Sequence, residues 1–458
     1  MKLALIGGGS VRSPEFVRGA LAFAHDLDLR EVWLMDIDPA RLAALTPLCE
    51  EIARQAGAPF RIHQTTALDE ALRDASIIVT TIRVGFERGR VLDERIALRR
   101  GILGQETTGP GGFAMAMRNV PALIEIAQRA EALAPRAWTF NFTNPAGLVA
   151  QALLAAGYPR VIGICDSANT AQHDIARWLS RPVDEVKTEV FGLNHLSWAR
   201  AATVEGRDVL GQLLDDDAFI NDTHLRFFDV DLVRRIGMFL NEYLFYYYYR
   251  DVAVERIQAE ELTRGEEVEL LNRDLFPTLR ELPPAAALRA YDAYNQRRSA
   301  SYMAYAESDA ALREERLHPT ERTRPPHHAQ AEVGGYAGVA LRAGLALTQD
   351  RPLRIALNVP NRGAIAGFAP DDVVEITCNV DGRGVQPIAI GEVPEAQYLL
   401  MRAVKRYERL AVEAILQRDR GLAVEALAAH PLVGSYALAG QLVADYMEAH
   451  REHIGAWT

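Results

Sequence analysis

Two side chains able to bind a metal ion lie at the ends of two successive predicted strands. Cys165 ends the β-branched run 161–165, and His195 follows the run 188–193. A thiolate and an imidazole suit a borderline divalent cation, with substrate oxygens and water completing its coordination. Two ligands alone leave an alternative open, in which Cys165 is a small buried side chain and His195 a hydrogen-bonded core residue.

Two further residues could move protons. Asp166 follows Cys165, so its side chain points away from that of Cys165 but stays in the same cleft. It could act as an acid or a base, or it could cap a helix that begins near Ala168. The aromatic run 243–249 predicts helix packing. A tyrosine in this run becomes a useful base only where a cation or a metal-bound oxyanion depresses its pKa.

A glycine-rich turn follows the first predicted strand, in the order Gly7-Gly8-Gly9-Ser10. Such a turn lets backbone N–H groups approach a pyrophosphate at the start of a helix, although Arg12 replaces the third glycine of the usual G-x-G-x-x-G pattern. Asp36 ends the second predicted strand, where a carboxylate can bind a ribose 2′-hydroxyl and would repel a 2′-phosphate. We therefore expect NAD rather than NADP. The alternative is a simple glycine turn followed by a helix-capping aspartate.

The first 200 residues alternate strand-like and helix-like segments, which predicts an α/β fold with a Rossmann-like, doubly wound parallel sheet. Ligands bind such sheets at the carboxyl ends of the strands. The strand-like runs are residues 3–6, 31–36, 60–65, 76–82, 137–142, 161–165 and 188–193. The helix-like segments are residues 14–24, 40–56, 118–133 and 147–156.

The pattern changes after about residue 191. Helical, aromatic and charged stretches dominate residues 227–307, strand-like runs return at 353–360 and 373–380, and residues 396–450 are helical. A stretch rich in histidine, proline and arginine, residues 317–330, predicts an exposed loop. We therefore expect a NAD-binding domain over residues 1–190 and a mixed α+β domain over 191–458, with roles in substrate and metal binding and in oligomerisation.

The composition is that of a globular protein with an acidic balance. The 458 residues carry 61 acidic and 50 basic side chains, a formal charge of −11, and 49% of them are hydrophobic. This balance argues against a nucleic-acid or anionic-membrane surface, and no apolar run approaches the ~18 residues of a membrane span. The three cysteines are far apart, which argues against a disulfide framework and favours a reducing cytoplasm.

Six motifs, in order along the chain, resemble those of family 4 glycoside hydrolases, nearest the 6-phospho-glucosidase branch. The similarity runs from residue 2 to about residue 395, with gaps between the motifs. The motifs are Ile6-Gly7-Gly8-Gly9-Ser10, Asp93-Glu94-Arg95, Gly104-Gln105-Glu106-Thr107, Phe142-Thr143-Asn144-Pro145-Ala146-Gly147, Gly192-Leu193-Asn194-His195 and Leu357-Asn358-Val359-Pro360-Asn361.

The resemblance implies a hydrolase that works through redox chemistry, with NAD and a divalent metal, Mn²⁺, as cofactors. In such enzymes NAD⁺ removes hydride from sugar C3, the metal holds the O2 and O3 oxygens, and a base takes the C2 proton. The glycosidic oxygen then leaves, water adds and the hydride returns. NAD is therefore restored in every cycle rather than consumed.

The resemblance also assigns roles by position. Cys165 and His195 would be the metal ligands, Tyr243 the base at C2, and Asp166 the group that assists the leaving oxygen. The contacts to the sugar or its phosphate would be Arg95, Asn144 and Arg297. The family further implies a small phosphorylated sugar as ligand and a homodimer or homotetramer as the assembly.

The chain departs from the 6-phospho-glucosidase pattern at several positions. Arg298 and Ser299 replace two glycines of a motif in phosphate-using relatives, and Ala168 stands where those relatives tend to carry proline. We expect a 6-phospho-β-glucosidase; the alternatives within the family are a 6-phospho-α-glucosidase and a glycosidase of non-phosphorylated sugars. Outside the family, the alternatives are a NAD-dependent 2-hydroxy-acid dehydrogenase and a non-catalytic, NAD-dependent sugar sensor.

Overall fold

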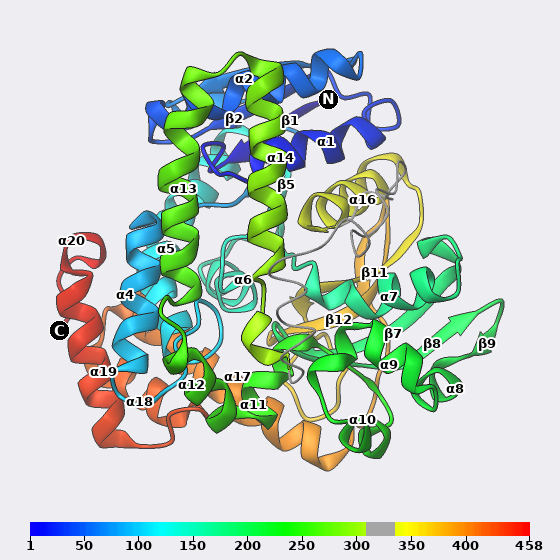
Figure 1. The fold of residues 1–458 in the computed structure, drawn as a ribbon, viewed down its shortest axis with the longest axis vertical. Coiled ribbons are helices and arrows are strands. Elements are labelled where there is room, and N and C mark those ends of the chain that lie inside the picture. Colours follow the sequence, from blue (N-terminus) through cyan, green and yellow to red (C-terminus); the bar gives the residue numbers. More distant parts are fainter. Residues whose placement is uncertain (308–334) are drawn as a thin grey trace.

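A computed structural model describes residues 1–307 and 335–458, so the loop predicted at residues 317–330 lies outside the described residues. Its main body is a nine-stranded sheet (Figure 1). In spatial order the strands are β13 (Gly384–Pro387), β12 (Val373–Asp381), β11 (Leu353–Pro360), β6 (Val161–Gly163), β5 (Trp138–Asn141), β4 (Ile77–Thr80), β1 (Lys2–Ile6), β2 (Glu31–Met35) and β3 (Arg61–Thr65).

Strands β1 to β6 pair in parallel, whereas β11, β12 and β13 add to the sheet in antiparallel fashion. The central strands β1 and β4 are buried apolar runs, as expected for a parallel sheet covered by helices, whereas the edge strand β3 is polar and only partly buried. The helices that connect them are α1 (Ser13–Phe23), α2 (Pro39–Gln55), α3 (Leu68–Leu72), α4 (Phe86–Leu98), α5 (Pro110–Leu133) and α6 (Ala146–Ala155). The predicted Rossmann-like sheet is therefore confirmed, and it also incorporates three strands from beyond residue 190.

The last strand-like run of the first 200 residues, 188–193, does not join this sheet. Strand β7 (Val186–Leu193) pairs antiparallel with β8 (Leu196–Val204), and β10 (Phe239–Leu240) and β9 (Arg207–Asp208) extend that second sheet. The chain reverses through Asn194 and His195, a two-residue loop in which His195 has φ +62°. A hairpin this tight satisfies the strand locally, so it overrides the expected parallel alternation.

Helix α5 begins eight residues earlier than the segment predicted at 118–133. Its first turn contains Gly111 and Gly112, where a Cβ would come within 2.3 Å of the Gln105 carbonyl oxygen and 2.0 Å of the Thr107 carbonyl oxygen. Glycine therefore lets the helix start pack on the loop before it. This close approach explains why a polar, glycine-rich stretch continues into a helix.

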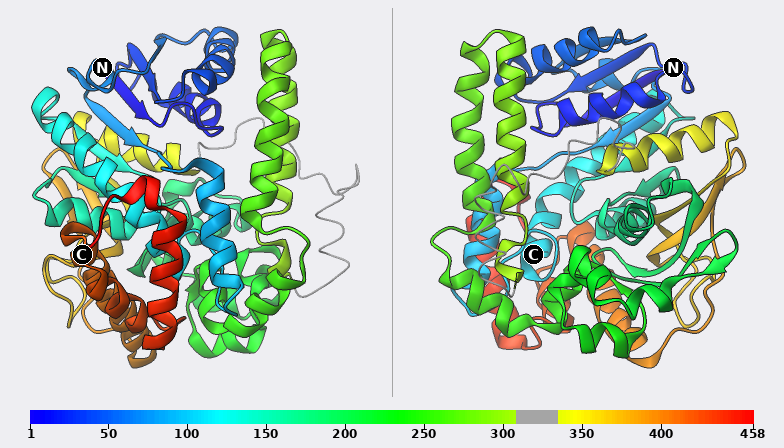
Figure 2. Two further views of the ribbon diagram at one scale, coloured as in Figure 1. Left: turned by 90° about the vertical axis from the view of Figure 1, so that its left-hand side faces the viewer. Right: turned by 45° about the vertical axis from the view of Figure 1, so that its right-hand side comes forward.

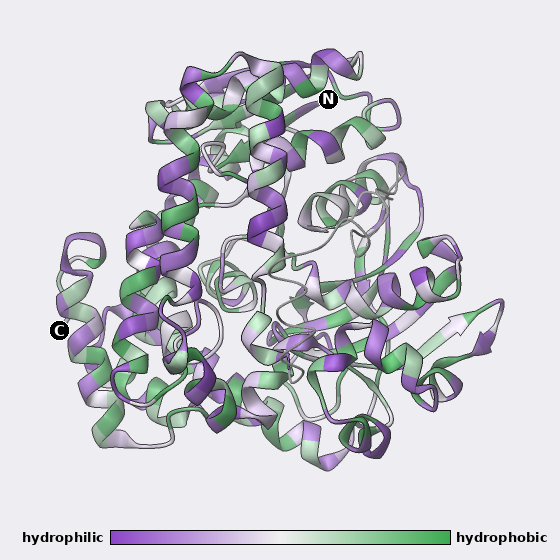
Figure 3. Ribbon diagram, viewed as in Figure 1, coloured by the Kyte–Doolittle hydropathy of each residue, from purple (hydrophilic) through white to green (hydrophobic). Residues whose placement is uncertain are grey.

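Helices α13 (Arg264–Glu281) and α14 (Pro284–Ala300) form an antiparallel pair beside α2 (Figures 1 and 2). A small separate core joins this hairpin to α2 and to Val11 in the glycine-rich turn. The Tyr291 hydroxyl donates to the Val11 carbonyl oxygen at 2.6 Å, and the Tyr294 hydroxyl donates to Asn272 Oδ1 at 2.6 Å. Hydrophilic and hydrophobic residues alternate around the two helices (Figure 3), so one face packs while the other stays polar.

The remaining helices lie around the second sheet and at the C-terminal end, except α16 (Gly335–Gln349), which packs on α1 and on β11 and β12 of the main sheet. They are α7 (Thr170–Trp178), α8 (Leu210–Leu214), α9 (Asp217–Asp222), α10 (Val230–Ile236), α11 (Phe245–Tyr248), α12 (Arg250–Ala259), α16 (Gly335–Gln349), α17 (Glu395–Gln417), α18 (Arg420–Ala429), α19 (Tyr436–Ala449) and α20 (Arg451–Ile454). These helices and the antiparallel second sheet give the mixed α+β part that the sequence predicts. Within the described ranges, no helix is both long and apolar enough to cross a membrane.

Candidate active site

The glycine-rich turn between β1 and α1 faces Asp36, which follows β2. The Gly9 N–H donates to Asp36 Oδ2 at 2.9 Å, and a Cβ at Gly9 would lie 2.8 Å from the same carboxyl group. Gly7 has φ +98°, and a Cβ there would lie 2.5 Å from the Thr81 carbonyl oxygen. Both positions therefore require glycine. The turn is held tightly against the carboxylate that the sequence singled out.

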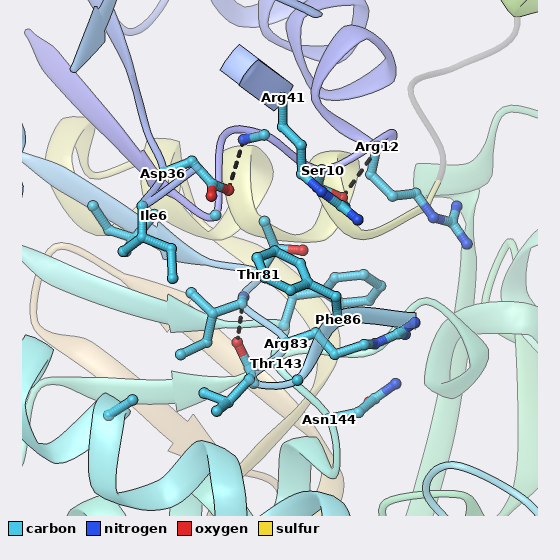
Figure 4. A pocket seen from close by; sticks show the side chains of 18 of the residues that line it. Ile6, Ser10, Arg12, Asp36, Arg41, Thr81, Arg83, Phe86, Thr143 and Asn144 are labelled. Carbon is cyan, nitrogen blue, oxygen red and sulfur yellow. Dashed lines mark hydrogen bonds between the residues drawn. The ribbon is translucent and has the colours of Figure 1, made fainter. Parts of the chain in front are cut away.

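Helix capping is the role of Asp38, not of Asp36. Asp38 Oδ1 accepts hydrogen bonds from the Ala40 and Arg41 N–H groups at the start of α2. Asp36 instead borders a cavity of about 560 Å³ (Figure 4). Burial raises the pKa of Asp36, and the N–H groups of Asp38 and Gly9 oppose that rise.

This nucleotide-side cavity runs from the glycine-rich turn to the segments that follow β4 and β5. Of the predicted cofactor-binding residues, Gly8 alone does not line it. A Cβ at Gly8 would lie 2.7 Å from Leu34 Cα, so this glycine packs the turn on β2. A glycine turn, a helix start and a carboxylate around one cavity fit a dinucleotide. Figure 4 shows the opposite wall, with Arg83, Thr143 and Asn144.

Cys165 and His195 meet at a second cavity of about 380 Å³, called the sugar-side cavity below because the motif resemblance implies a sugar ligand there. Cys165 follows β6 of the main sheet, His195 follows β7 of the second sheet, and Cys165 Sγ lies 3.3 Å from His195 Nε2. Ser167 Oγ is 3.1 Å from the same sulfur. The two cavities share Arg12, Glu106, Phe142, Asn144 and Arg298 in their walls, so the thiol–imidazole pair lies next to the nucleotide side.

The protonation of this pair suits a metal ligand set. Burial lowers the pKa of His195 to about 3, so the imidazole is neutral at pH 7. Burial raises the pKa of the Cys165 thiol well above its usual range, so the thiol needs a nearby cation to ionise. Metal–sulfur and metal–nitrogen bonds of about 2.3 and 2.1 Å are compatible with two donors 3.3 Å apart.

Across residues 1–307 and 335–458, no group of three or more His, Cys, Asp or Glu side chains is arranged to hold a metal ion. Cys165 and His195 would therefore supply two ligands and leave positions for oxygen atoms of a substrate. Such an open coordination is typical of catalytic rather than structural metal sites.

Tyr243 lies directly on the imidazole. It belongs to a short helical turn, Glu242–Leu244, and its ring stacks on His195 with centroids 3.6 Å apart and an interplanar angle of 15°. Burial raises the pKa of Tyr243 well above its usual range. The hydroxyl can therefore act as a base only if positive charge is held beside it, which is the place of the Cys165–His195 pair.

Asp166 lines the same cavity and does not cap a helix. The helical turn after it, Ser167–Asn169, receives no hydrogen bond from its side chain. Glu242, beside Tyr243, is a buried carboxyl group in this wall, and burial raises its pKa to about 7. The sugar-side cavity thus combines a thiol–imidazole pair, a phenol and carboxyl groups, which suits proton transfer around a polar ligand.

The structure separates the three predicted substrate contacts. Asn144 lines both cavities, whereas Arg95 and Arg297 line neither. Arg95 pairs with Glu266, and Arg297 is exposed on α14. In their place, Arg90 and Arg298 reach the sugar-side cavity.

Helical spacing explains both differences, and it is the sequence pattern that could have predicted which arginines line the cavity. Arg90 shares the buried face of α4 with Asp93, Glu94 and Ala97, spaced i, i+3, i+4 and i+7, and Arg95 falls outside this face. On α14, Arg298 follows the buried Tyr291 and Tyr294 at i+7 and i+4, whereas Arg297 falls one residue outside that spacing. The motif resemblance fixed the segment but not the face.

Arginine side chains surround the junction of the two cavities. Five of them have carboxylate partners, namely Arg12, Arg41, Arg83, Arg90 and Arg264. Arg298 forms no ion pair in the described part of the chain, and its buried Nε has no hydrogen-bond partner there. Burial and the nearby Arg12 lower the pKa of Arg298 to about 10. A guanidinium with a buried Nε and no carboxylate partner in residues 1–307 and 335–458 suits an anionic ligand.

Glu106 lies within one of the six motifs, and the sequence predicts no individual role for it. In the structure it lies at the centre of this arginine group. Arg83 Nη2 donates to Glu106 Oε2 at 2.6 Å, and Arg90 Nη1 lies 3.2 Å from the same oxygen. Although burial acts in the opposite direction, these arginines lower the pKa of Glu106 to about 2. Glu106 therefore pairs with both Arg83 and Arg90, whereas Arg298 has no carboxylate within ion-pair distance among the described residues.

Two family models match most of the chain. The model of family 4 glycosyl hydrolases matches residues 2–181, and the model of their C-terminal domain matches residues 190–433. The chain belongs to family 4 of the glycosyl hydrolases. This confirms the resemblance drawn from the six motifs, and with it a hydrolase rather than a dehydrogenase or a sensor.

Relatives of this family 4 hydrolase are named for phosphorylated glucosides. The chain is 29% identical to the probable 6-phospho-β-glucosidase of Bacillus subtilis, with 99% of this chain and 97% of the relative covered. It is 28% identical to the 6-phospho-β-glucosidase of Escherichia coli, with 99% and 96% covered. A maltose-6′-phosphate glucosidase of Bacillus subtilis is 27% identical, with 98% and 96% covered.

Solved structures of the family share the whole fold. The 6-phospho-β-glucosidase of Thermotoga maritima, with manganese, NAD⁺ and glucose-6-phosphate, has a TM-score of 0.81 and 28% identity, with 99% of each chain covered. A 6-phospho-α-glucosidase from gut microorganisms, with NAD and glucose-6-phosphate, has a TM-score of 0.81 and 25% identity, with 100% of each chain covered. Malate dehydrogenase from Plasmodium falciparum, at 13% identity and a TM-score of 0.51, shares the fold alone.

Proposed function

We propose that this family 4 hydrolase cleaves 6-phosphorylated glucosides, as a 6-phospho-β-glucosidase, with NAD and Mn²⁺ as cofactors. The observation that carries the proposal is the cluster of Cys165, His195 and Tyr243 in a cavity that adjoins the nucleotide-side cavity. The Thermotoga maritima relative binds the same three ligands, manganese, NAD⁺ and glucose-6-phosphate. The relatives at 29% and 28% identity are named as a probable 6-phospho-β-glucosidase and a 6-phospho-β-glucosidase, which supports the β anomer.

The cofactors would be held by residues already described. Gly7, Gly9, Ser10 and Asp36 would bind the dinucleotide, with Gly8 packing the turn on β2, and Cys165 and His195 would bind the metal. When bound, NAD accepts a hydride from the sugar and the divalent cation draws electron density from the sugar oxygens, which together make the C2 proton acidic.

The chain's own residues would then move the protons. Tyr243 would take the proton from sugar C2, because its ring stacks on His195 and a cation held by Cys165 and His195 would favour the phenolate form. Asp166 would donate a proton to the departing glycosidic oxygen from the same cavity wall. Asn144, which lines both cavities, would orient the sugar between the two cofactors.

Arg298 and Arg90 would recognise the 6-phosphate in place of the predicted Arg297 and Arg95. Arg298 is the one arginine in the cavity walls that lacks a carboxylate partner among the described residues. A phosphate carries the charge and the acceptor oxygens that such a guanidinium requires.

Hydrolysis of a chromogenic β-glucoside 6-phosphate tests the proposal. We expect turnover that requires NAD⁺, Mn²⁺ and a thiol reductant, with no accumulation of NADH. The non-phosphorylated glucoside should have a kcat/KM lower by at least about 100-fold, because two buried guanidinium contacts are lost. Steady-state kinetics on the α- and β-glucosides, with and without phosphate, give all four comparisons.

The variant Arg298→Ala isolates the phosphate contact. It should raise KM for the 6-phosphate about tenfold or more and leave KM for the non-phosphorylated glucoside unchanged. The exposed neighbour Arg297→Ala is the matched control and should change neither value. Activity that persists without both cofactors, or equal activity on the two glucosides, would contradict the proposal.

Asp36 gives a separate prediction for the cofactor. Asp36→Ser should weaken NAD⁺ binding about tenfold and narrow the preference for NAD⁺ over NADP⁺, because the carboxylate that binds a ribose 2′-hydroxyl is lost. Fluorescence titration of each nucleotide measures both effects. The control is Asp38→Ser, which removes a carboxylate outside the cavity and keeps a side chain able to cap α2. An equal loss of NAD⁺ affinity in the two variants would show that Asp36 does not contact the cofactor.

We also propose a cytoplasmic homodimer or homotetramer with no nucleic-acid or membrane partner. Cys49, Cys165 and Cys378 are all buried and unpaired, which favours a reducing compartment. Apolar side chains are exposed on the C-terminal helices α17 and α19, namely Leu399, Leu416 and Tyr436, and could form a subunit interface. The division into domains at residue 190 remains a proposal.

A further inference from the structure

The triplet Asp93-Glu94-Arg95 on α4 has no role in the proposed chemistry, yet each of its side chains bonds to another helix. Asp93 pairs with the buried Arg118 of α5, with both guanidinium–carboxylate distances at 2.7 Å. Arg118 Nε also donates at 2.9 Å to the carbonyl oxygen of Val84, which lines the nucleotide-side cavity. Asp93 therefore supports the nucleotide side, while Glu94 and Arg95 reach α13.

Glu94 contacts the first turn of α13 at close range. The Gly265 N–H donates to Glu94 Oε2 at 2.7 Å, and a Cβ at Gly265 would lie 2.7 Å from that oxygen. Arg90 Nε donates to the other oxygen, Oε1, at 2.7 Å, and the Glu94 side chain is buried. Both oxygens of the buried Glu94 carboxylate are therefore held by hydrogen bonds, and the position of this carboxylate fixes the distance between α4 and α13.

Arg95 contacts the same turn through Glu266. Both of its donors, Nε and Nη2, bond to the Glu266 carboxylate, and the Nε contact measures 2.8 Å. This pairing lowers the pKa of Glu266. Glu266 also accepts the Thr263 N–H at 2.8 Å, which closes the capping box that begins α13. Arg95 is therefore engaged at the helix start and faces away from the cavity.

The start of α13 in turn holds the end of α14. Arg264, the first residue of α13, lines the sugar-side cavity, and its Nη2 donates to the Arg298 carbonyl oxygen at 2.6 Å. Its Nη1 bonds to Glu267 and to Ser301 Oγ. A continuous series of contacts therefore runs from Glu94 and Arg95, through the first turn of α13, to the backbone that carries Arg298.

We propose that Glu94 and Arg95 are positioning residues, which fix the first turn of α13 and, through Arg264, the backbone that carries Arg298, so that Arg298 faces the sugar phosphate. The inference rests on the proposed function, since it assigns the positioned side chain to the 6-phosphate. It gives Arg95 a role that acts through Glu266 and not on the substrate. The motif is then a clamp between α4 and the α13–α14 hairpin.

A double-mutant cycle on Arg95 and Glu266 tests this inference. Arg95→Gln and Glu266→Gln should each raise KM for a chromogenic glucoside 6-phosphate by roughly fivefold to tenfold. They should leave kcat and KM for the non-phosphorylated glucoside within about twofold. The double variant should be no worse than either single variant, because both remove one and the same contact. The glutamine of Glu266→Gln retains a side-chain oxygen for the capping box.

Two further variants sharpen the result. Gly265→Ala forces a Cβ against the buried Glu94 carboxylate and should reproduce the KM effect without any change of charge. Arg100→Gln is the matched control, because it removes an arginine–carboxylate pair that joins the same segment to Asp445 of α19 instead of to α13. A rise in KM for Arg95→Gln with wild-type behaviour of Glu266→Gln would overturn the inference in favour of direct substrate contact. Additive effects of the two glutamine variants would overturn it as well.

Amide hydrogen exchange separates this inference from the proposed function. Residues 264–267 should exchange faster in Arg95→Gln and Glu266→Gln than in the wild type, and should be unchanged in Arg100→Gln. Failure of the wild type to cleave any 6-phosphorylated glucoside would contradict the proposed function. The clamp would still be supported by faster exchange at the start of α13, and it would be overturned by unchanged exchange.

Discussion

Cys165→Ser is expected to abolish metal-dependent hydrolysis, with a loss of at least about 100-fold in kcat/KM. Serine keeps the shape of the side chain but does not provide a thiolate, the ligand that pairs with His195 at 3.3 Å. The loss should appear in a titration with Mn²⁺ as weakened activation, while NAD⁺ affinity stays within about twofold, because Cys165 does not line the nucleotide-side cavity.

Cys378→Ser is the matched control for this loss. Cys378 is a buried, unpaired thiol on β12 that lines neither cavity, so its replacement should leave Mn²⁺ activation unchanged. The wild-type affinity for Mn²⁺ should also rise with pH by about tenfold per pH unit below neutrality, because burial keeps the Cys165 thiol protonated and metal binding must release that proton. Full activity of Cys165→Ser, or a wild-type affinity for Mn²⁺ that does not change with pH, would show that Cys165 is not a metal ligand.

The parallel half of the fold could be predicted from sequence because its determinants are local. Strands β1, β2 and β4 to β6 are short, mostly buried runs, each followed by a helical segment, and the glycine-rich turn follows directly after the first of them. The prediction of a single parallel sheet was wrong for β7. There the decisive feature was a two-residue turn, Asn194-His195, which redirects the chain into a second sheet.

Cys165 and His195 lie close together, as the sequence predicts, but the strands that position them are not the expected neighbours. We expected Cys165 and His195 to follow neighbouring strands of one sheet, and they follow strands of two different sheets. What brings them together is that both strand ends face the same cavity. Motif order therefore carried information about the site that strand alternation did not.

The arginines proposed to bind the substrate show that a motif does not predict which side chains line a cavity. A motif places a segment in the fold, but the face of a helix decides which of its residues meets the ligand. Arg90 and Arg95 differ by five positions on α4, so they point to different sides, and the same is true of the adjacent Arg297 and Arg298 on α14. The α13–α14 hairpin could not be placed by local patterns, because its docking depends on long-range contacts such as Tyr291 with Val11.

Tyr243→Phe is expected to lower kcat by roughly 10²- to 10⁴-fold, the usual contribution of a general base, and to leave KM within about threefold. Phenylalanine keeps the ring that stacks on His195 at 3.6 Å, so the loss reports the hydroxyl alone. Wild-type product formed in D₂O should gain deuterium at C2, and the variant should lose this exchange together with turnover. Tyr248→Phe, which removes a hydroxyl bonded to Trp198 outside the cavity, is the control.

The two largest effects should not add. Burial raises the pKa of Tyr243, so a cation held by Cys165 and His195 would be needed to favour loss of the phenol proton and leave a phenolate that can accept the C2 proton. Once Cys165→Ser has removed that charge, the further change Tyr243→Phe should cost less than about threefold, since residues that act as a unit are lost together. Losses that multiply in the double variant would show that the base and the metal site work independently. C2 exchange that survives in Tyr243→Phe would show that another group in the same wall, such as Asp166 or Glu242, takes the proton.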